Sequence, residues 1–229
     1  MAPVGAMAQQ KWYVRAEGGP MLSVSYSTKS GYYSTGSDLR HQYGVSGGMR
    51  LGTDSYFSLE TGLSRQSHSV IATLRDADGA GQYRHVVEEY SVLKVPVRVT
   101  ADLLPQHSKV GFQFVGGLCY LFKPGRKAVG EQVPANVSQL VIDEETGRSA
   151  TVTSKYFLDG AWGIETGLRA SYKITDHFAA ELAGVVQAGL SHMATTTITH
   201  NQPGTTIPVA ESISRGEAVS LLLSVRYSF

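Results

Sequence analysis

Apolar and polar residues alternate along most of this chain. Apolar residues occupy every second position from Val219 to Phe229, and Ser or Arg fills most of the positions between them. Successive side chains of a β-strand point to opposite faces, so this period of two predicts a strand with one apolar and one polar face. Similar segments recur along the chain, and we predict strands at residues 12–26, 42–51, 56–74, 85–103, 109–123, 155–173, 177–195 and 217–229.

The apolar faces carry aromatic residues near both ends of the predicted strands. Tyr156 and Tyr172 mark one such segment, and Trp12 and Tyr26 mark another. Aromatic girdles at two interfaces and strands of about 10 residues or more are typical of membrane β-barrels, whereas soluble strands average about five or six residues. No run reaches the about 18 apolar residues of a spanning helix, which leaves a closed barrel as the membrane-spanning option. A soluble sandwich or a lipocalin-like barrel remains an alternative.

The predicted connections alternate between short and long. The short ones are residues 52–55, 104–108 and 174–176, and the long ones are residues 27–41, 75–84, 124–154 and 196–216. Outer-membrane barrels have short periplasmic turns and long external loops. We therefore predict an all-β fold, an eight-stranded antiparallel up-and-down transmembrane β-barrel, with both termini periplasmic. Pro96 lies inside one predicted strand, where its missing N–H predicts a bulge or a local irregularity.

Composition narrows the class of protein further. Charged residues make up 17% of the 229 residues, against about 25% in ordinary soluble domains. The 20 basic and 19 acidic residues nearly cancel, which argues against a nucleic-acid partner. The single Cys cannot form an internal disulfide, and no Cys/His cluster has zinc-ligand spacing. We expect no metal and no cofactor.

The N-terminus has the form of a signal-peptidase site. Ala6-Met7-Ala8 precedes Gln9 in a small-x-small pattern, although no long apolar segment precedes it. We interpret residues 1–8 as the end of an export signal and residues 9–229 as one barrel domain. An arbitrary Ala-rich terminus is the alternative.

The same alternation predicts which side chains fill the barrel. An eight-stranded barrel is just wide enough to be filled by its own side chains, and enclosed charges are stable only when they are paired. We predict a salt-bridge network in the lumen, with polar packing favoured over a gate or a proton path, and with Cys119 as a small buried filler. The predicted members are Arg15, Glu17, Arg50, Glu60, Lys94, Arg98, Asp102, Asp159, Glu165, Arg169, Lys173, Glu181 and Arg226.

The sequence offers only weak candidates for the Ser, His and acidic residues of a hydrolase active site. Ser67-His68-Ser69 and Ser191-His192 lie near the predicted outer rim, with Glu88 and Glu89 close in sequence. A lipid A deacylase needs Ser, His and an acid together on one face, whereas adjacent strand residues point to opposite faces. The acidic run at residues 143–145 lacks the remaining ligands of a Ca²⁺ site. We expect no enzymatic activity.

Two segments resemble known outer-membrane barrels. The terminal Tyr227-Ser228-Phe229, at the end of an alternating strand, resembles the C-terminal assembly signal of bacterial barrels, carried by Tyr227 and Phe229. The segment Tyr90-Ser91-Val92-Leu93-Lys94-Val95-Pro96-Val97 is similar to a motif of the PorT-like family, among the small OmpA/OmpX-like barrels. The resemblance covers nearly all of residues 11–229. It implies an eight-stranded barrel, in some members acting in secretion or envelope assembly, and it carries no catalytic residues.

We expect this protein to function by binding partners, and its long loops are the candidate contact surfaces. Residues 27–41 include Tyr32 and Tyr33 among Ser, Gly and Asp, a composition found at adaptable recognition surfaces, although such loops also simply close barrels. Residues 124–154, with Val141 and Ile142, are expected to form a hairpin extension or to dock on a partner.

We expect a structural or accessory subunit of a secretion or assembly complex in the bacterial outer membrane. Its partners would be outer-membrane lipid and lipopolysaccharide, the barrel-assembly machinery and envelope proteins. The alternatives are a narrow channel for ions or small solutes and a lipid A hydrolase.

Overall fold

The computed structural model describes residues 12–27, 33–34, 37–51, 56–75, 82–104, 108–123, 136–142, 149–156, 160–202 and 205–229. The strands are β1 (Trp12–Ser27), β2 (Tyr33–Ser34), β3 (Ser37–Arg50), β4 (Phe57–Arg75), β5 (Gln82–Asp102), β6 (Val110–Phe122), β7 (Asn136–Ile142), β8 (Ser149–Tyr156), β9 (Ala161–Lys173), β10 (Phe178–Gly189), β11 (Ala194–Gln202) and β12 (Thr205–Ser228). Over these ranges, no helix is both long enough and apolar enough to cross a membrane.

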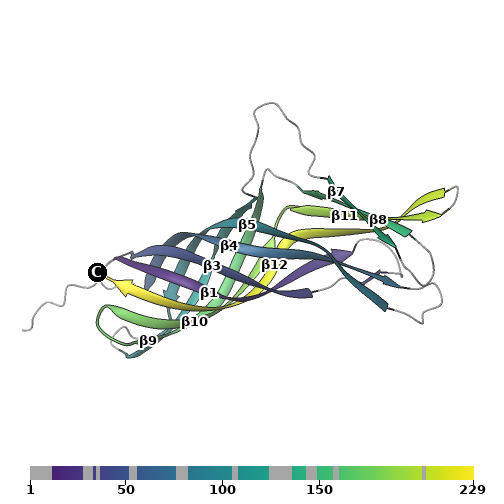
Figure 1. The fold of residues 1–229 in the computed structure, drawn as a ribbon. Coiled ribbons are helices and arrows are strands. Elements are labelled where there is room, and N and C mark those ends of the chain that lie inside the picture. Colours follow the sequence, from purple (N-terminus) through teal and green to yellow (C-terminus); the bar gives the residue numbers. More distant parts are fainter. Residues whose placement is uncertain are drawn as a thin grey trace, which may run out of the picture.

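Eight of these strands close into a barrel (Figure 1). The order is β1-β3-β4-β5-β6-β9-β10-β12, and antiparallel pairing of β12 with β1 completes the cylinder. Each barrel strand therefore pairs with its neighbour in chain order, apart from the strands outside the cylinder. The predicted eight-stranded antiparallel meander is confirmed.

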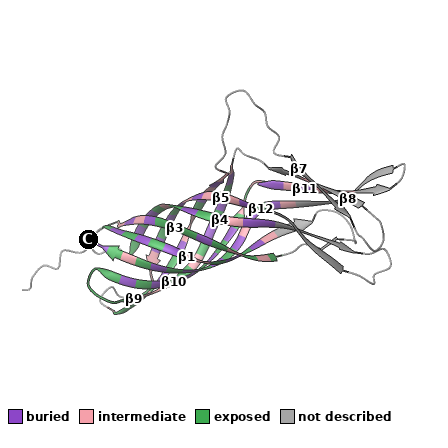
Figure 2. Cartoon of the chain, in the orientation of Figure 1, coloured by how far each residue is buried: buried purple, intermediate pink, exposed green. Residues whose placement is uncertain are grey.

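Exposed and buried positions alternate along the barrel strands, as Figure 2 shows. Leu221 is 50% exposed and Leu223 is 68% exposed, whereas Leu222 between them is 1% exposed. Most exposed large side chains of the wall are apolar, while the enclosed positions hold many charged and amide side chains. Apolar residues thus face outward, the orientation required in lipid and the reverse of a lipocalin-like barrel.

Both ends of the described chain lie at one end of the barrel, called here the terminal end. The Phe229 amide donates to the Trp12 carbonyl at 3.1 Å, and the Ser228 amide donates to the His177 carbonyl at 2.8 Å. The opposite end, called the distal end, carries strands that project beyond the cylinder (Figure 1). The short turn between β9 and β10 lies at the terminal end, as the alternation of connection lengths predicts.

Strands β7, β8 and β11 form a distal extension on β12. β12 pairs with β11, β11 with β8, and β8 with β7, all antiparallel. Val141 is paired with Ala150 and Ile142 with Ser149, so the hairpin expected within residues 124–154 is present. The extension continues the sheet of the barrel along one side of the distal end (Figure 1).

Two predicted strands are each divided in the structure. The segment 155–173 is split between β8 and β9, and the segment 177–195 runs through β10 into the start of β11. Gly160 separates β8 from β9 with a positive φ of 89°, a conformation that favours glycine. Alternation continues on both sides of such a break because both sides are strands, so the period of two could not reveal it.

Of the bulge or local irregularity predicted at Pro96, the bulge is absent, and the irregularity is a local gap in the pairing of β4 with β5. β4 and β5 keep one register from Thr61↔Val97 to Ser64↔Lys94, without a shift. The ladder with β6 also continues through Pro96↔Cys119. Thr61 Oγ1 donates to the Pro96 carbonyl at 3.0 Å, which satisfies this carbonyl without supplying the N–H that proline lacks. Cys119 is 1% exposed and faces the lumen, as its position in the alternation predicts.

Candidate functional site

The barrel interior encloses a balanced set of charges. Among the described residues, four basic and four acidic side chains are buried there: Arg15, Lys94, Arg98, Arg169, Glu17, Glu60, Glu165 and Glu181. They come from β1, β4, β5, β9 and β10, in positions where the alternation turns polar side chains inward. Equal numbers of each sign allow every enclosed charge to face an opposite one, which offsets the cost of removing it from water.

Glu60 is the centre of the cluster nearer the terminal end. Its carboxylate binds Arg15 Nη1 at 2.9 Å and Arg169 Nη1 at 2.8 Å, and Tyr13 Oη donates to it at 2.7 Å. Arg15 also bridges to Glu181, with Nε 2.5 Å from Oε2. Four strands are therefore tied together across the lumen by two carboxylates.

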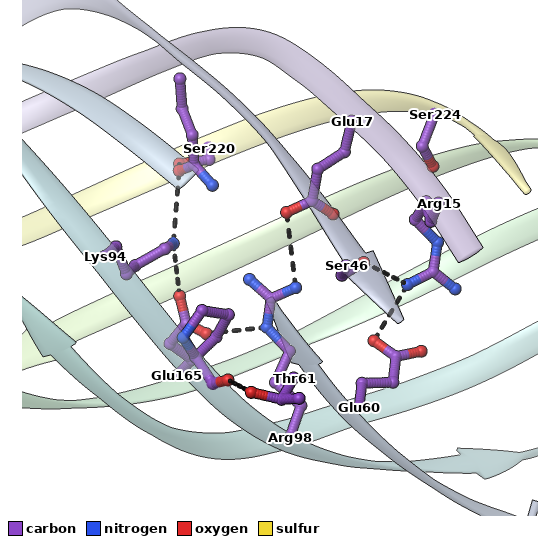
Figure 3. A network of polar contacts seen from close by, with 12 residues as sticks. Arg15, Glu17, Ser46, Glu60, Thr61, Lys94, Arg98, Glu165, Ser220 and Ser224 are labelled. Carbon is purple, nitrogen blue, oxygen red and sulfur yellow. Dashed lines mark hydrogen bonds and ion pairs between the residues drawn. The ribbon is translucent and has the colours of Figure 1, made fainter. Parts of the chain in front are cut away.

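Glu165 is the centre of the second cluster. Lys94 Nζ lies 2.6 Å from Oε1, and Arg98 Nε lies 2.8 Å from Oε2, so each carboxylate oxygen has its own cation. Figure 3 shows both cations directed at this carboxylate, with Arg98 Nη1 reaching Glu17 Oε1 at 3.5 Å. The two clusters fill the cross-section of the narrow barrel with paired groups.

The predicted residues nearest the terminal end are less enclosed. Arg50 and Asp102 are half-buried and lie 3.2 Å apart, and Gln113 donates to the Asp102 carboxylate at 2.6 Å. Arg226 is half-buried, with Nε 3.4 Å from Glu181 Oε1.

One predicted lumen residue is exposed, and another cannot be placed. Lys173 is exposed, so the prediction that the barrel encloses it is wrong. It is the last residue of β9, at the mouth of the barrel, where the wall no longer surrounds it. Asp159 lies outside the described residues.

Uncharged residues complete the lumen and are missing from the predicted set. Gln42, Gln66 and Gln187 are buried, and Gln66 Nε2 donates to Gln42 Oε1 at 2.8 Å and to Gln187 Oε1 at 3.2 Å. Lys94 Nζ lies 3.4 Å from the amide oxygens of Gln42 and Gln187, which links this layer to the charges. The sequence does carry the signal, since Gln66 lies on the same face of its strand as Glu60, but the predicted set includes only charged residues.

An aromatic and apolar layer follows toward the distal end. His68 is fully buried, hydrogen-bonds Ser23 Oγ through Nδ1 at 3.0 Å and stacks on Tyr90 with ring centroids 5.5 Å apart. Tyr90 packs with Leu121 and Met193 in a buried apolar cluster. From the terminal end to this layer, the lumen passes from ion pairs to amides to apolar packing.

The hydrolase candidates do not assemble into a triad in the described part of the chain. Ser67 faces outward and pairs with His41 Nε2 at 3.4 Å, while His68 faces inward, as expected for adjacent strand residues. Ser191 Oγ accepts the Trp162 amide at 3.2 Å, and His192 is exposed. No carboxylate hydrogen-bonds His41 among the described residues, and the side chain of Glu88 is not described.

Metal ligands likewise do not cluster in the described ranges, where no group of three or more His, Cys, Asp or Glu could hold an ion. The acidic run at residues 143–145, the weak Ca²⁺ candidate, lies outside those ranges.

Tyr227 and Phe229 lie at the terminal end on the outer face. Tyr227 is 38% exposed and Phe229 57% exposed, with ring centroids 5.8 Å apart. Tyr227 also packs against Phe178 at 5.0 Å and His177 at 5.8 Å. They belong to an aromatic group at the edge of the barrel, and their role as an assembly signal stays a prediction.

Comparison with known proteins supports the fold. The chain matches the solved structure of the outer membrane protein OprG from Pseudomonas aeruginosa with a TM-score of 0.61 and 11% identity, over 96% of this chain and 97% of that one. This chain therefore has the fold of a small outer-membrane β-barrel. A major outer membrane protein from Thermus thermophilus aligns over 96% and 98% of the two chains, with 14% identity and a TM-score of 0.49. Neisserial surface protein A aligns over 95% and 97%, with 15% identity and a TM-score of 0.46. No family model and no curated protein matches this sequence.

Proposed function

We propose that this protein is an integral outer-membrane barrel that serves as a structural or accessory subunit of a cell-envelope complex engaged in secretion or membrane assembly. It makes its contacts through the distal extension, the external loops or the outer wall. The proposal places both termini in the periplasm and the distal end outside the cell.

The filled lumen is the observation that carries this proposal. Arg15, Arg98 and Arg169 are each 2% exposed or less, and each is paired with a carboxylate across the lumen. A channel needs continuous space for water or solute, whereas these side chains occupy the centre of the barrel and hold one another in place. Interaction surfaces are then the functional part of the molecule.

The distal extension offers such a surface. Strand β7 is the last strand of the extension, so in the described part of the chain one of its edges has no neighbouring strand. A free strand edge presents unpaired N–H and C=O groups that can add a strand from a partner. The resemblance of residues 90–97 to the PorT-like motif agrees with a role in secretion or envelope assembly.

The proposal is tested by cross-linking in native membranes. Tagged wild-type chain is compared with a variant in which residues 136–156, the β7–β8 hairpin, are replaced by a short turn. The barrel strands do not pair with β7 or β8, so the variant should still show heat-modifiable migration. The expected result is a defined set of cross-linked envelope proteins for wild type and its loss in the variant. Recovery of the wild-type chain alone would contradict an accessory role.

A further inference from the structure

A small polar cluster lies on the outer wall of β3, β4 and β5. It consists of His41, Tyr43, Arg65, Ser67 and Ser91, called here the outer polar cluster. Tyr43 and Arg65 are cross-strand partners, and so are Ser67 and Ser91. Arg65 Nη1 donates to Tyr43 Oη at 3.4 Å and Nη2 donates to Ser91 Oγ at 3.1 Å. His41 stacks on Tyr43, with ring centroids 6.1 Å apart and planes 7° apart.

On β4 the cluster lies at the distal end of the exposed apolar row, and on β3 the exposed Leu39 lies two residues beyond His41. Phe57, at the terminal end of β4, is 51% exposed, and Leu59 and Leu63 continue the exposed apolar row toward Arg65. The eight residue-to-residue steps from Phe57 to Arg65 span about 20 Å along the barrel axis, given a rise of about 3.3 Å per residue and a tilt of about 40°. The apolar band of such barrels is about 25 Å tall. Arg65 therefore lies toward the distal edge of this band, from which a long arginine side chain can reach the lipid headgroups.

The positive charge of Arg65 has no carboxylate partner in the described part of the chain. Its hydrogen bonds go to two neutral hydroxyl groups and use two of its five N–H donors. Glu89, two residues before Ser91 on β5, is paired with Arg40. In contrast, the buried arginines of the lumen all bind carboxylates. A guanidinium held in place with unused donors is suited to an oxyanion, and especially to phosphate.

We propose that the outer polar cluster binds a phosphate group of lipid A, the phosphorylated glycolipid of the outer leaflet. Arg65 supplies the charge and the hydrogen-bond donors, and Tyr43, His41 and the two serines fix its position. Exposed Val45 and Leu63, next to the cluster on the terminal side, provide an apolar wall for acyl chains. This inference rests on the proposed function, because that function places the distal end in the outer leaflet.

The test measures lipid A binding to the full-length folded protein in detergent micelles by native mass spectrometry. Lipid A with its phosphates is compared with dephosphorylated lipid A, for wild type, Arg65→Gln, Arg65→Lys and Arg215→Gln. Arg215→Gln is the matched control, since it removes one exposed arginine from β12 next to Glu217. We expect wild type to prefer the phosphorylated lipid, and Arg65→Gln to bind it about fivefold more weakly, the effect of one basic residue at an anionic surface. Arg65→Lys should retain part of the preference, and the control should bind like wild type.

Three results would overturn the lipid site. One is equal binding of the two lipids by wild type, another is equal loss in Arg65→Gln and the control, and the third is full competition by millimolar inorganic phosphate, which would indicate a free-phosphate site. Heat-modifiable migration and insertion into vesicles are measured in parallel. Failure to insert would overturn the membrane function itself, whereas insertion without a phosphate preference would overturn only the lipid site.

Discussion

Glu60 accepts hydrogen bonds from Tyr13, Arg15 and Arg169, so a single carboxylate stabilises two guanidinium groups in the lumen. These enclosed charged residues therefore stabilise the folded barrel. Removing one member leaves the others buried without full compensation, which is more costly than the net value of the intact pair.

Replacement Glu60→Gln tests this role. The free energy of unfolding should fall by about 3 kcal/mol, because Arg15 and Arg169 lose their shared counter-ion while remaining enclosed. Urea titration of the vesicle-inserted protein, followed by tryptophan fluorescence, measures the change. Asp176→Asn is the control, since Asp176 is exposed in the turn before β10 and its loss should change stability by less than about 0.5 kcal/mol. A loss below about 1 kcal/mol for Glu60→Gln would argue against the network.

Leu223→Arg tests the outward face of the same wall. Leu223 is 68% exposed, and Arg near the bilayer midplane of a barrel costs about 2–4 kcal/mol. The same substitution at Leu51, which is 51% exposed at the terminal edge, should cost about 0–1 kcal/mol. Unfolding titrations in vesicles compare the two variants. Equal stability of Leu223→Arg and wild type would be incompatible with a lipid-facing Leu223.

At the scale of elements, Gly160 and Gly184 are a contrasting pair. Gly160 has a φ of 89°, and an added Cβ would lie 2.3 Å from Tyr120 Oη, whereas a Cβ at Gly184 would meet nothing within 4 Å. Gly160→Ala should therefore destabilise the protein by about 1–3 kcal/mol, because Gly160 lies directly before β9 in this conformation, while Gly184→Ala should be close to neutral. Thermal unfolding in detergent measures both. Equal midpoints for the two variants would contradict the strained geometry at Gly160.

The sequence predicts elements well where one physical rule dominates. Each of the eight barrel strands overlaps a predicted segment, because the period of two follows directly from one buried and one exposed face. Two predicted starts are wrong, since β3 begins at Ser37 and β12 begins at Thr205, inside the predicted loops 27–41 and 196–216. The strands of the extension are not predictable one by one, because alternation persists through Gly160 and because β7, β8 and β11 pair beyond the cylinder. The effect of Pro96 is not predictable from its own position either, since its carbonyl binds Thr61 of a neighbouring strand and its pairing with β6 continues.

In the molecule as a whole, the sequence predicts which kinds of side chain line the lumen but not which of them contact one another. Alternation identifies Arg15, Glu60 and Glu165 as inward residues, but only the closed barrel shows which cation meets which carboxylate. The amide layer around Gln66 requires counting every inward polar residue, charged or not. The outer polar cluster cannot be read from the sequence, because His41 and Ser67 meet only through the pairing of β3 with β4.

A filled lumen predicts no conductance. The ion pairs around Glu60 and Glu165 close the cross-section, and the apolar packing of Tyr90, Leu121 and Met193 follows toward the distal end. Purified protein in planar lipid bilayers should show no discrete conductance steps above leak. Stable, reproducible steps from heat-modifiable protein would instead favour the narrow-channel alternative.

A membrane barrel requires that the apolar row of the wall face hydrocarbon and that the polar row face an enclosed interior. Spin labels at Leu221 and Leu223, and separately at Ser220 and Ser224, test it in a Cys119→Ser background after insertion into vesicles. We expect high collision rates with oxygen and low rates with a water-soluble nickel complex at the two leucines, and low rates with both reagents at the two serines. Leucine labels shielded from oxygen together with serine labels open to nickel would contradict it.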